Sequence, residues 1–278
     1  RGLGDVYKRQ AKESKKKVPK QKSEIPFYHS IAMRLIASFL LPVVGVLVLG
    51  IVSYNKASSA IVNTYKESVQ QTANTMQQYI NLVITSEKDE FKTYLTESDL
   101  RKYFGQFLDA YDESSIRKDY QSRFRNKMAL DSKMQSVFII ADEKKTIDGN
   151  GKVYGRNIYS DYAKCEQGKI ATSSASNWYF FGVNEDADKV LDLDIQNYCF
   201  RIAKKMNNQP AMMIINISDK FIRSTMQSLN PGKGGYVALI TDQDGKEFFS
   251  DGNVSTDKSL IYGTSFYKNC LLYTSPSP

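Results

Sequence analysis

Residues 35–54, LIASFLLPVVGVLVLGIVSY, form a stretch without one charged side chain. This stretch constrains the fold more than any other feature, because a helix of its length is ~30 Å long and matches the hydrocarbon thickness of a bilayer. It predicts one transmembrane helix. A cleaved signal peptide is a competing interpretation, but its apolar region is usually only ~7–15 residues long. A helix buried in a soluble core is another, and such apolar segments are usually ~10–14 residues long.

The two ends of the chain are set apart from the rest. Residues 5–10, DVYKRQ, can be written in codons whose reverse complement, read one base along, encodes residues 270–275, CLLYTS. Unrelated protein ends do not encode each other's antisense, and the wider segments resemble translated sequencing adapters. We therefore expect residues 1–10 and 270–278 to be adapter-like artefacts, and residues 11–269 to be a segment cut at both ends.

The positive charge of the chain is concentrated before the apolar stretch. The formal net charge is +8, and residues 11–34 hold seven basic and two acidic side chains, a net +5 (seven minus two). Basic residues beside a span stay cytoplasmic and can contact anionic lipid. We expect a single-span protein of the cell membrane with residues 11–34 in the cytoplasm, in contact with membrane lipid, and a domain outside the cytoplasm. The charge gives no reason to expect a nucleic-acid partner.

A heptad-like pattern follows the apolar stretch and predicts a long stalk helix that ends at about Leu95. Its positions are Val62, Tyr65, Val69, Thr72, Met76, Tyr79 and Val83. This seam packs on its own domain or also pairs with a second copy in a homodimer, and Thr72 with the two tyrosines leaves both alternatives open.

Two shorter helices and a set of strands come next. Ser98-Asp99 predicts the N-cap of a helix that reaches about Tyr111, and Ser114-Ser115 that of a helix ending near Met128. Strands are predicted at residues 134–141, 178–183, 190–194, 198–203 and 211–217. Ser218-Asp219 predicts the N-cap of a helix over residues 220–229. Residues 231–235, PGKGG, then predict a turn into a final hairpin with its tip at residues 242–245.

A short internal repeat organises these elements into an α+β fold. Residues 137–142, VFIIAD, and 237–242, VALITD, are both apolar strands that run into an aspartate. We expect two sheet modules in tandem after the stalk and helical region at residues 55–114. The first spans residues 115–217, and the second, truncated, spans residues 218–269.

The basic tail, the span, the stalk start LGIVSYNKAS (residues 49–58) and the segment at residues 214–246 together resemble bacterial methyl-accepting chemotaxis receptors with a double Cache sensor region. In residues 214–246 the family's Gly-Tyr, apolar strand and Asp-x-Asp-Gly turn are met by Gly235-Tyr236, residues 237–240 and residues 242–245. The resemblance implies two PAS-like (Cache) modules with antiparallel sheets. It also implies a small-molecule pocket in the membrane-distal module.

The same resemblance names candidate ligand-binding residues. Amino-acid-sensing members carry an arginine two residues before a Trp-Tyr pair, whereas here Ser176 precedes Trp178-Tyr179. Amino-acid sensing is therefore not implied. The remaining candidates that could line the pocket are Tyr154, Arg156, Asp194 and Tyr198.

Catalytic and metal chemistry find little support in the sequence. His29 is the one histidine and precedes the apolar stretch, which excludes a His-based triad or His-ligated zinc site beyond it. Residues 232–235, GKGG, lack the pattern of a phosphate loop. Glu185, Asp186, Asp188, Asp192 and Asp194 do not follow the calcium-loop pattern and are interpreted as a solvated face. Cys165 and Cys199 either pair or stay free. We expect no enzyme activity, no metal and no cofactor.

Two function classes remain, and a third interpretation is disfavoured. The first, favoured by the tail and stalk, is a chemoreceptor that signals across the membrane. The second is the sensor region of a membrane histidine kinase or a cyclic-dinucleotide synthase. The third is a signal-anchored binding protein.

Overall fold

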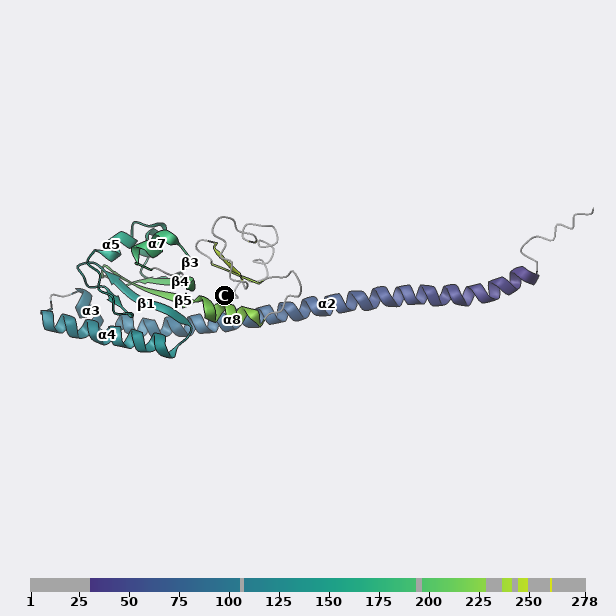
Figure 1. The fold of residues 1–278 in the computed structure, drawn as a ribbon, viewed down its shortest axis with the longest axis horizontal. Coiled ribbons are helices and arrows are strands. Elements are labelled where there is room, and N and C mark those ends of the chain that lie inside the picture. Colours follow the sequence, from purple (N-terminus) through teal and green to yellow (C-terminus); the bar gives the residue numbers. More distant parts are fainter. Residues whose placement is uncertain are drawn as a thin grey trace, which may run out of the picture. The chain divides into compact units, whose positions relative to one another are not determined.

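The computed structural model divides the chain into two units, Arg1–Lys66 and Glu67–Pro278 (Figure 1). It describes residues 31–105, 108–193, 197–228, 237–241, 245–249 and 261.

Helix α2 (Ile31–Thr96) is continuous over 66 residues and contains the predicted transmembrane stretch. The apolar side chains there are exposed, with Leu41 at 76% and Val46 at 70%. By length and composition, α2 is the one helix among the described residues that could cross a membrane. Its end at Thr96 confirms the predicted end near Leu95.

Helices α3 (Ser98–Gly105) and α4 (Ala110–Leu130) correct two predicted boundaries. The first predicted helix does not reach Tyr111, and Ser114-Ser115 lies inside α4 instead of capping it. The reason is Asp109, whose extended backbone and side chain form the true N-cap, with Oδ1 accepting from the backbone N–H of Asp112 at 2.7 Å.

Replacing Asp109 by alanine is expected to lower the free energy of unfolding by about 1 kcal/mol, since one helix-end N–H loses its acceptor. The measurement is urea unfolding of the full chain in detergent micelles, followed by the fluorescence of its one tryptophan, Trp178. Ser115→Ala, in the exposed interior of α4, is the control, with an expected effect within about 0.5 kcal/mol. A larger loss of unfolding free energy for Ser115→Ala than for Asp109→Ala would instead support Ser114-Ser115 as the N-cap.

The centre of the second unit is a five-stranded antiparallel sheet of order β2-β1-β5-β4-β3. Its strands are β1 (Met134–Ala141), β2 (Ile147–Asp148), β3 (Tyr179–Gly182), β4 (Tyr198–Lys205) and β5 (Ala211–Ser218). Every residue of β5 is buried, as expected for a central strand whose two faces are both covered. The predictions at residues 134–141, 178–183, 198–203 and 211–217 are confirmed.

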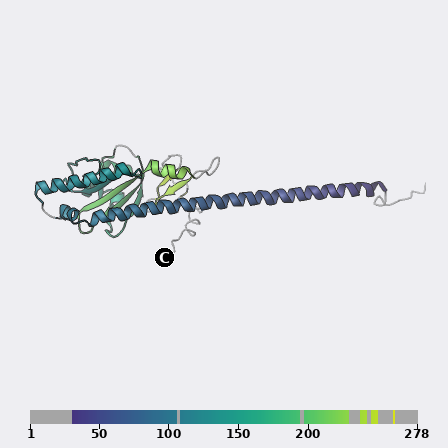
Figure 2. The same ribbon diagram turned by 90° about the horizontal axis from the view of Figure 1, so that it is seen from below.

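Helices cover both faces of this sheet (Figures 1 and 2). On the long-helix face, Ile139, Ile202 and Met213 join a core with Phe91 of α2 and Phe124 of α4. The short-helix face lies under α5 (Ile158–Tyr162), α6 (Glu166–Thr172) and α7 (Glu185–Val190). Alternate residues along the strands thus point into two separate apolar cores, one on each face of the sheet.

The predicted strand at residues 190–194 is wrong. Residues up to Val190 belong to α7, which begins because the side chain of Asn184 accepts from the N–H of Ala187 at 2.9 Å. Leu191 and Asp192 form a turn after it, and Asp194 lies outside the described residues. Ala187 of α7 and Leu191 at its C-terminal end are both buried. The apolar residues of this acidic segment therefore reflect the packing of a short helix and not the alternation of a strand.

A second antiparallel pair follows α8 (Asp219–Gln227), which Ser218 caps as predicted. This pair is β6 (Ala238–Ile240) with β7 (Glu247–Phe249). Like β1 with β2, β6 pairs antiparallel with the next strand in the chain. The predicted turn at residues 231–235 and the tip at residues 242–244 lie outside the described residues.

Candidate functional site

The adjacent candidates Trp178 and Tyr179 lie on opposite faces of the sheet. Trp178 packs against the long-helix core, with Nζ of Lys204 5.8 Å from its ring centroid. Tyr179 belongs to the short-helix face, where its hydroxyl is 2.8 Å from Oγ of Ser173. Successive strand side chains point to opposite faces, so these two residues cannot contact the same small ligand.

Tyr154 and Arg156 both hold the C-terminal end of α7. The Tyr154 hydroxyl is shared between the carbonyl of Leu191 at 3.2 Å and Oδ2 of Asp148 at 3.1 Å. Nη2 of Arg156 donates to the carbonyl of Val190 at 2.7 Å and to Oδ1 of Asp192 at 2.8 Å. The Arg156 cation, predicted to be available for a ligand, is therefore engaged at the surface.

Asp148, the partner of Tyr154, is 2% exposed. Burial raises the pKa of its carboxyl group, although the N–H of Asn150 and the hydroxyl of Tyr154 act in the opposite direction. The folded protein therefore holds this proton to a higher pH than the unfolded chain, so Asp148 contributes stability at low pH that is lost as pH rises through the folded pKa.

Asp148→Asn is expected to remove this pH-dependent loss of stability. The asparagine side chain keeps an oxygen that can accept a hydrogen bond, and it carries no charge at any pH. The unfolding free energy of Asp148→Asn, taken relative to the natural protein, is expected to rise as the pH increases from about 4, the ordinary pKa of an aspartate, through the raised pKa of the folded state. Thermal melts across this range measure it, with the 85%-exposed Asp186 changed to asparagine as a control. A difference independent of pH would contradict the assignment.

Tyr198, the last described candidate, leads to a buried polar group that the sequence analysis missed. Its hydroxyl donates to Oδ1 of Asp188 at 2.7 Å and accepts from Nη2 of Arg201 at 3.1 Å. Arg201 is 0% exposed. Its Nη2 reaches Oδ1 of Asp188 at 2.5 Å, its Nε donates to Oδ1 of Asn216 at 3.0 Å, and its Nη1 to Oε1 of Gln167 at 3.0 Å. We call Tyr162, Gln167, Asp188, Tyr198, Arg201 and Asn216 the Arg201 cluster.

Five elements, α5, α6, α7, β4 and β5, bring the Arg201 cluster together on the short-helix face. Arg201 of β4 is directly opposite Asn216 of β5 in the antiparallel register, which places both side chains on one face. Gln167 arrives from α6, whose close approach requires Gly168: a Cβ there would lie 1.7 Å from the carbonyl oxygen of Tyr162. Asp188 arrives from α7. The cluster is therefore a product of tertiary packing, not of local sequence.

Asp188 corrects the interpretation of the acidic run as a solvated face. Glu185, Asp186 and Asp192 are exposed, but Asp188 is 2% exposed and forms the ion pair with Arg201. Burial opposes the charge on Arg201, yet Tyr198, Tyr162 and Asp188 outweigh it and raise its pKa. Arg201 therefore stays cationic inside the protein.

Two oxygen atoms of the cluster are less well satisfied. Within the described part of the chain, Oδ2 of Asp188 and the hydroxyl oxygen of Tyr162 are buried without a hydrogen-bond partner. A buried polar atom without a partner costs about 1–3 kcal/mol. Burial raises the pKa of Tyr162 to about 12, and the nearby Arg201 guanidinium acts in the opposite direction, so this hydroxyl keeps its proton at neutral pH.

Cys165 and Cys199 lie on opposite faces of the sheet and are free. Cys165 packs on the short-helix side and caps α6, with Sγ accepting from the N–H of Gly168 at 3.4 Å. Cys199 is buried in the long-helix core. The alternative of a disulfide between them is thus not realised. Among the described residues, no three His, Cys, Asp or Glu side chains are grouped as a metal site.

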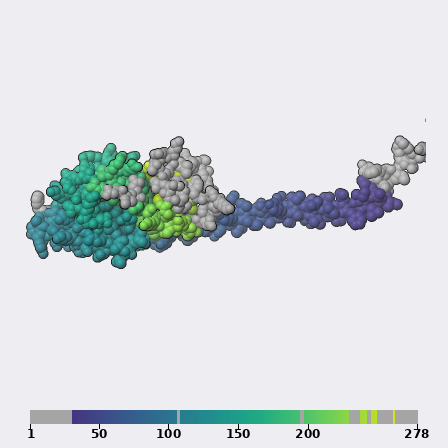
Figure 3. All heavy atoms as spheres, in the orientation of Figure 1, coloured from purple at the N-terminus to yellow at the C-terminus, as the bar shows by residue number. Residues whose placement is uncertain are grey.

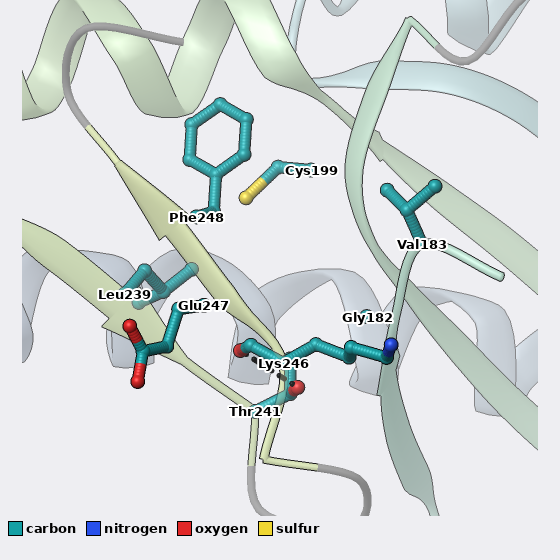
Figure 4. A pocket seen from close by; sticks show the side chains of 8 residues that line it. All are labelled: Gly182, Val183, Cys199, Leu239, Thr241, Lys246, Glu247 and Phe248. Atoms are coloured by element: carbon teal, nitrogen blue, oxygen red, sulfur yellow. Dashed lines mark hydrogen bonds between the residues drawn. The ribbon is translucent and has the colours of Figure 1, made fainter. Parts of the chain in front are cut away.

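A small cavity lies between the sheet and the β6–β7 hairpin (Figure 4). Its volume of about 10 Å³ has room for no more than one water molecule. The Lys246 side chain extends toward Gly182 in Figure 4, and a Cβ on Gly182 would lie 2.1 Å from Cβ of Lys246. The lining residues are Gly182, Val183, Cys199, Leu239, Thr241, Lys246, Glu247 and Phe248. An organic ligand does not fit here.

The Arg201 cluster is therefore a buried group of hydrogen-bonded side chains that includes the predicted candidate Tyr198. A guanidinium with two tyrosine hydroxyls has donor groups of the kind that bind an anion. Figure 3 shows the packed surface of atoms on one side of the second unit. No protein-family model, no curated protein and no solved structure matches this chain.

Proposed function

We propose that this chain is the extracytoplasmic ligand-sensing region of a transmembrane receptor of the chemotaxis type, with double Cache architecture. It binds a small molecule outside the cell and signals across the membrane as a homodimer, without catalysis of its own.

One observation carries this proposal: a single helix, α2, contains both the apolar stretch and side chains that are buried against the sheet module. Residues 35–54 of α2 have the length and composition of a membrane span. Further along α2, Ile80, Val83, Glu87 and Phe91 are buried. A change in packing around these four residues acts directly on the helix that carries the span, as a transmembrane signal requires.

Ion pairs add to the attachment of α2. Glu87 is 2% exposed, and its carboxylate oxygens lie 3.2 Å from Nζ of Lys127 on α4 and 3.2 Å from Nζ of Lys133, just before β1. Burial raises the pKa of Glu87, while Lys127 and Lys133 act in the opposite direction. Buried charges that are paired in this way tolerate little displacement, which favours a coupled movement of α2, α4 and the sheet.

The sheet module also supports the proposal. An antiparallel sheet with long helices on one face and short helices on the other agrees with the PAS-like module that the resemblance implies. The short-helix face carries the Arg201 cluster, a polar group suited to ligand recognition. In the predicted dimer seam, Val62 is 46% and Tyr65 is 50% exposed, so both side chains are available to a second copy.

The test of the proposal is membrane topology. A reporter enzyme active only outside the cytoplasm, fused after Asn269, is expected to be active because the basic residues before the span stay inside. The same reporter fused after Lys22 in the basic tail is the control and should be inactive. Activity of the second fusion with silence of the first would overturn the receptor proposal.

A further inference from the structure

The charge balance of the Arg201 cluster rests on one side chain from a six-residue helix. Arg201 has three neutral partners, Tyr198, Gln167 and Asn216, and one anionic partner, Asp188 of α7. The neutral partners on β4 and β5 belong to the sheet. The anion, in contrast, is brought by α7, a short helix packed on one face of the sheet.

Asp188 is an incomplete partner for this cation. Only Oδ1 of its carboxylate is hydrogen bonded, to Arg201 and Tyr198. Oδ2 is buried with no partner among the described residues, and so is the hydroxyl oxygen of Tyr162. The cluster therefore offers more donors than the Asp188 carboxylate uses, and a free carboxylate could turn to accept from them with both oxygens.

We propose that Arg201, Tyr198 and Tyr162 form a binding site for a small carboxylate, and that Asp188 is an internal occupant which this ligand displaces. The inference rests on the proposed sensing function and names its ligand class. Arg201 differs from the arginine of amino-acid-sensing members, whose position is held by Ser176. Ser176 precedes β3, whereas Arg201 lies on β4.

Charge balance favours a carboxylate over an amine. A carboxylate that replaces Asp188 leaves the buried cation with one anion, so the interior stays neutral. An ammonium group bound at Oδ2 of Asp188 would add a second buried cation beside Arg201, which is unfavourable without a further anion.

Displacement of Asp188 would loosen α7 from the sheet. The remaining bonds to the end of α7 come from Tyr154 and Arg156, which hold the carbonyl oxygens of Leu191 and Val190. Two candidates from the sequence analysis thus act as positioning residues for the helix that carries Asp188. Ligand binding and movement of α7 are then one event, which gives the sensor two states.

The test uses Asp188→Asn in the full chain, reconstituted in lipid nanodiscs, with propionate as the probe. An internal competitor lowers the apparent affinity by the fraction of molecules in which the site is open, and a minor state populated at 10% or less corresponds to a factor of at least about ten. Asp188→Asn is therefore expected to bind propionate at least about tenfold more tightly than the natural protein. Isothermal titration and the shift in melting temperature measure this effect.

The matched control is Asp186→Asn, on the same helix but exposed, which should bind propionate as the natural protein does. Propylammonium chloride tests the alternative ligand and should bind neither variant. Equal or weaker propionate binding by Asp188→Asn would overturn the proposal, as would amine binding that this change abolishes.

A folding defect of Asp188→Asn leaves the test decisive. If the variant unfolds in buffer, propionate, but not propylammonium, is expected to restore its melting transition, and failure of that rescue overturns the proposal. Failure here is distinct from failure of the receptor proposal, which the reporter fusions decide without any ligand.

Discussion

Replacing Arg201 by methionine is expected to lower the free energy of unfolding by about 3–5 kcal/mol. The change leaves the Asp188 carboxylate buried without its cation, and breaking a buried ion pair from one side is costly for that reason. Urea unfolding of the full chain in detergent micelles, followed by Trp178 fluorescence, measures the effect. Arg156→Met is the matched control: this arginine is 44% exposed on its side chain and pairs with Asp192 at the surface, so a loss of about 1 kcal/mol or less is expected.

The double variant Arg201→Met/Asp188→Val separates the ion pair from the fold around it. Since both charges are removed together, it should lose less than the sum of the two single changes, with a coupling of about 1–3 kcal/mol. Additive losses would mean that the two side chains do not depend on each other. An Arg201→Met effect as small as that of Arg156→Met would contradict the burial of the cluster.

The central strands were predictable because their pattern is local. Strands β1, β4 and β5 have eight residues each and are mostly apolar, and apolar runs between turn residues are typical of buried strands. The helical course of α2 beyond the apolar stretch was predictable for the same reason, since the heptad-like pattern runs from Val62 to Val83.

The short helices were not predictable from periodicity. Helix α5 has five residues, α6 seven and α7 six, less than or about two turns, so no repeat of 3.6 residues can be recognised in them. Their starts depend on caps such as Asn184, and their burial depends on the sheet beneath them. The acidic residues around Leu191 and Leu193 also mimic the alternation of a strand, which explains the wrong strand at residues 190–194.

The site was predicted in part. Tyr198 was a candidate and lies in the Arg201 cluster, but Arg201 itself was missed. A signal was present: Arg201 and Asn216 each interrupt an apolar run, in YCFRIA and MMIINIS, and a polar residue in a buried strand needs a partner. What the sequence lacks is the register that places Arg201 opposite Asn216 and the fold that brings Asp188 to them.

Phe91→Ala tests the attachment of α2 to the sheet module and is expected to lower the unfolding free energy by about 3–5 kcal/mol, the usual loss for a buried phenylalanine. Phe91 is 0% exposed. Its ring centroid lies 5.6 Å from that of Tyr94 and 6.2 Å from that of Phe124 on α4. Truncation would leave a cavity where α2, α4 and the sheet meet.

Leu82→Ala is the matched control, because Leu82 lies on the same helix and is 68% exposed, so its loss should stay within about 0.5 kcal/mol. The same urea unfolding experiment compares the two variants. Equal effects would mean that α2 does not share the core of the sheet module. The proposal of transmembrane signalling would then lose its main support, because a helix that does not pack against the sheet module cannot transmit a movement of that module.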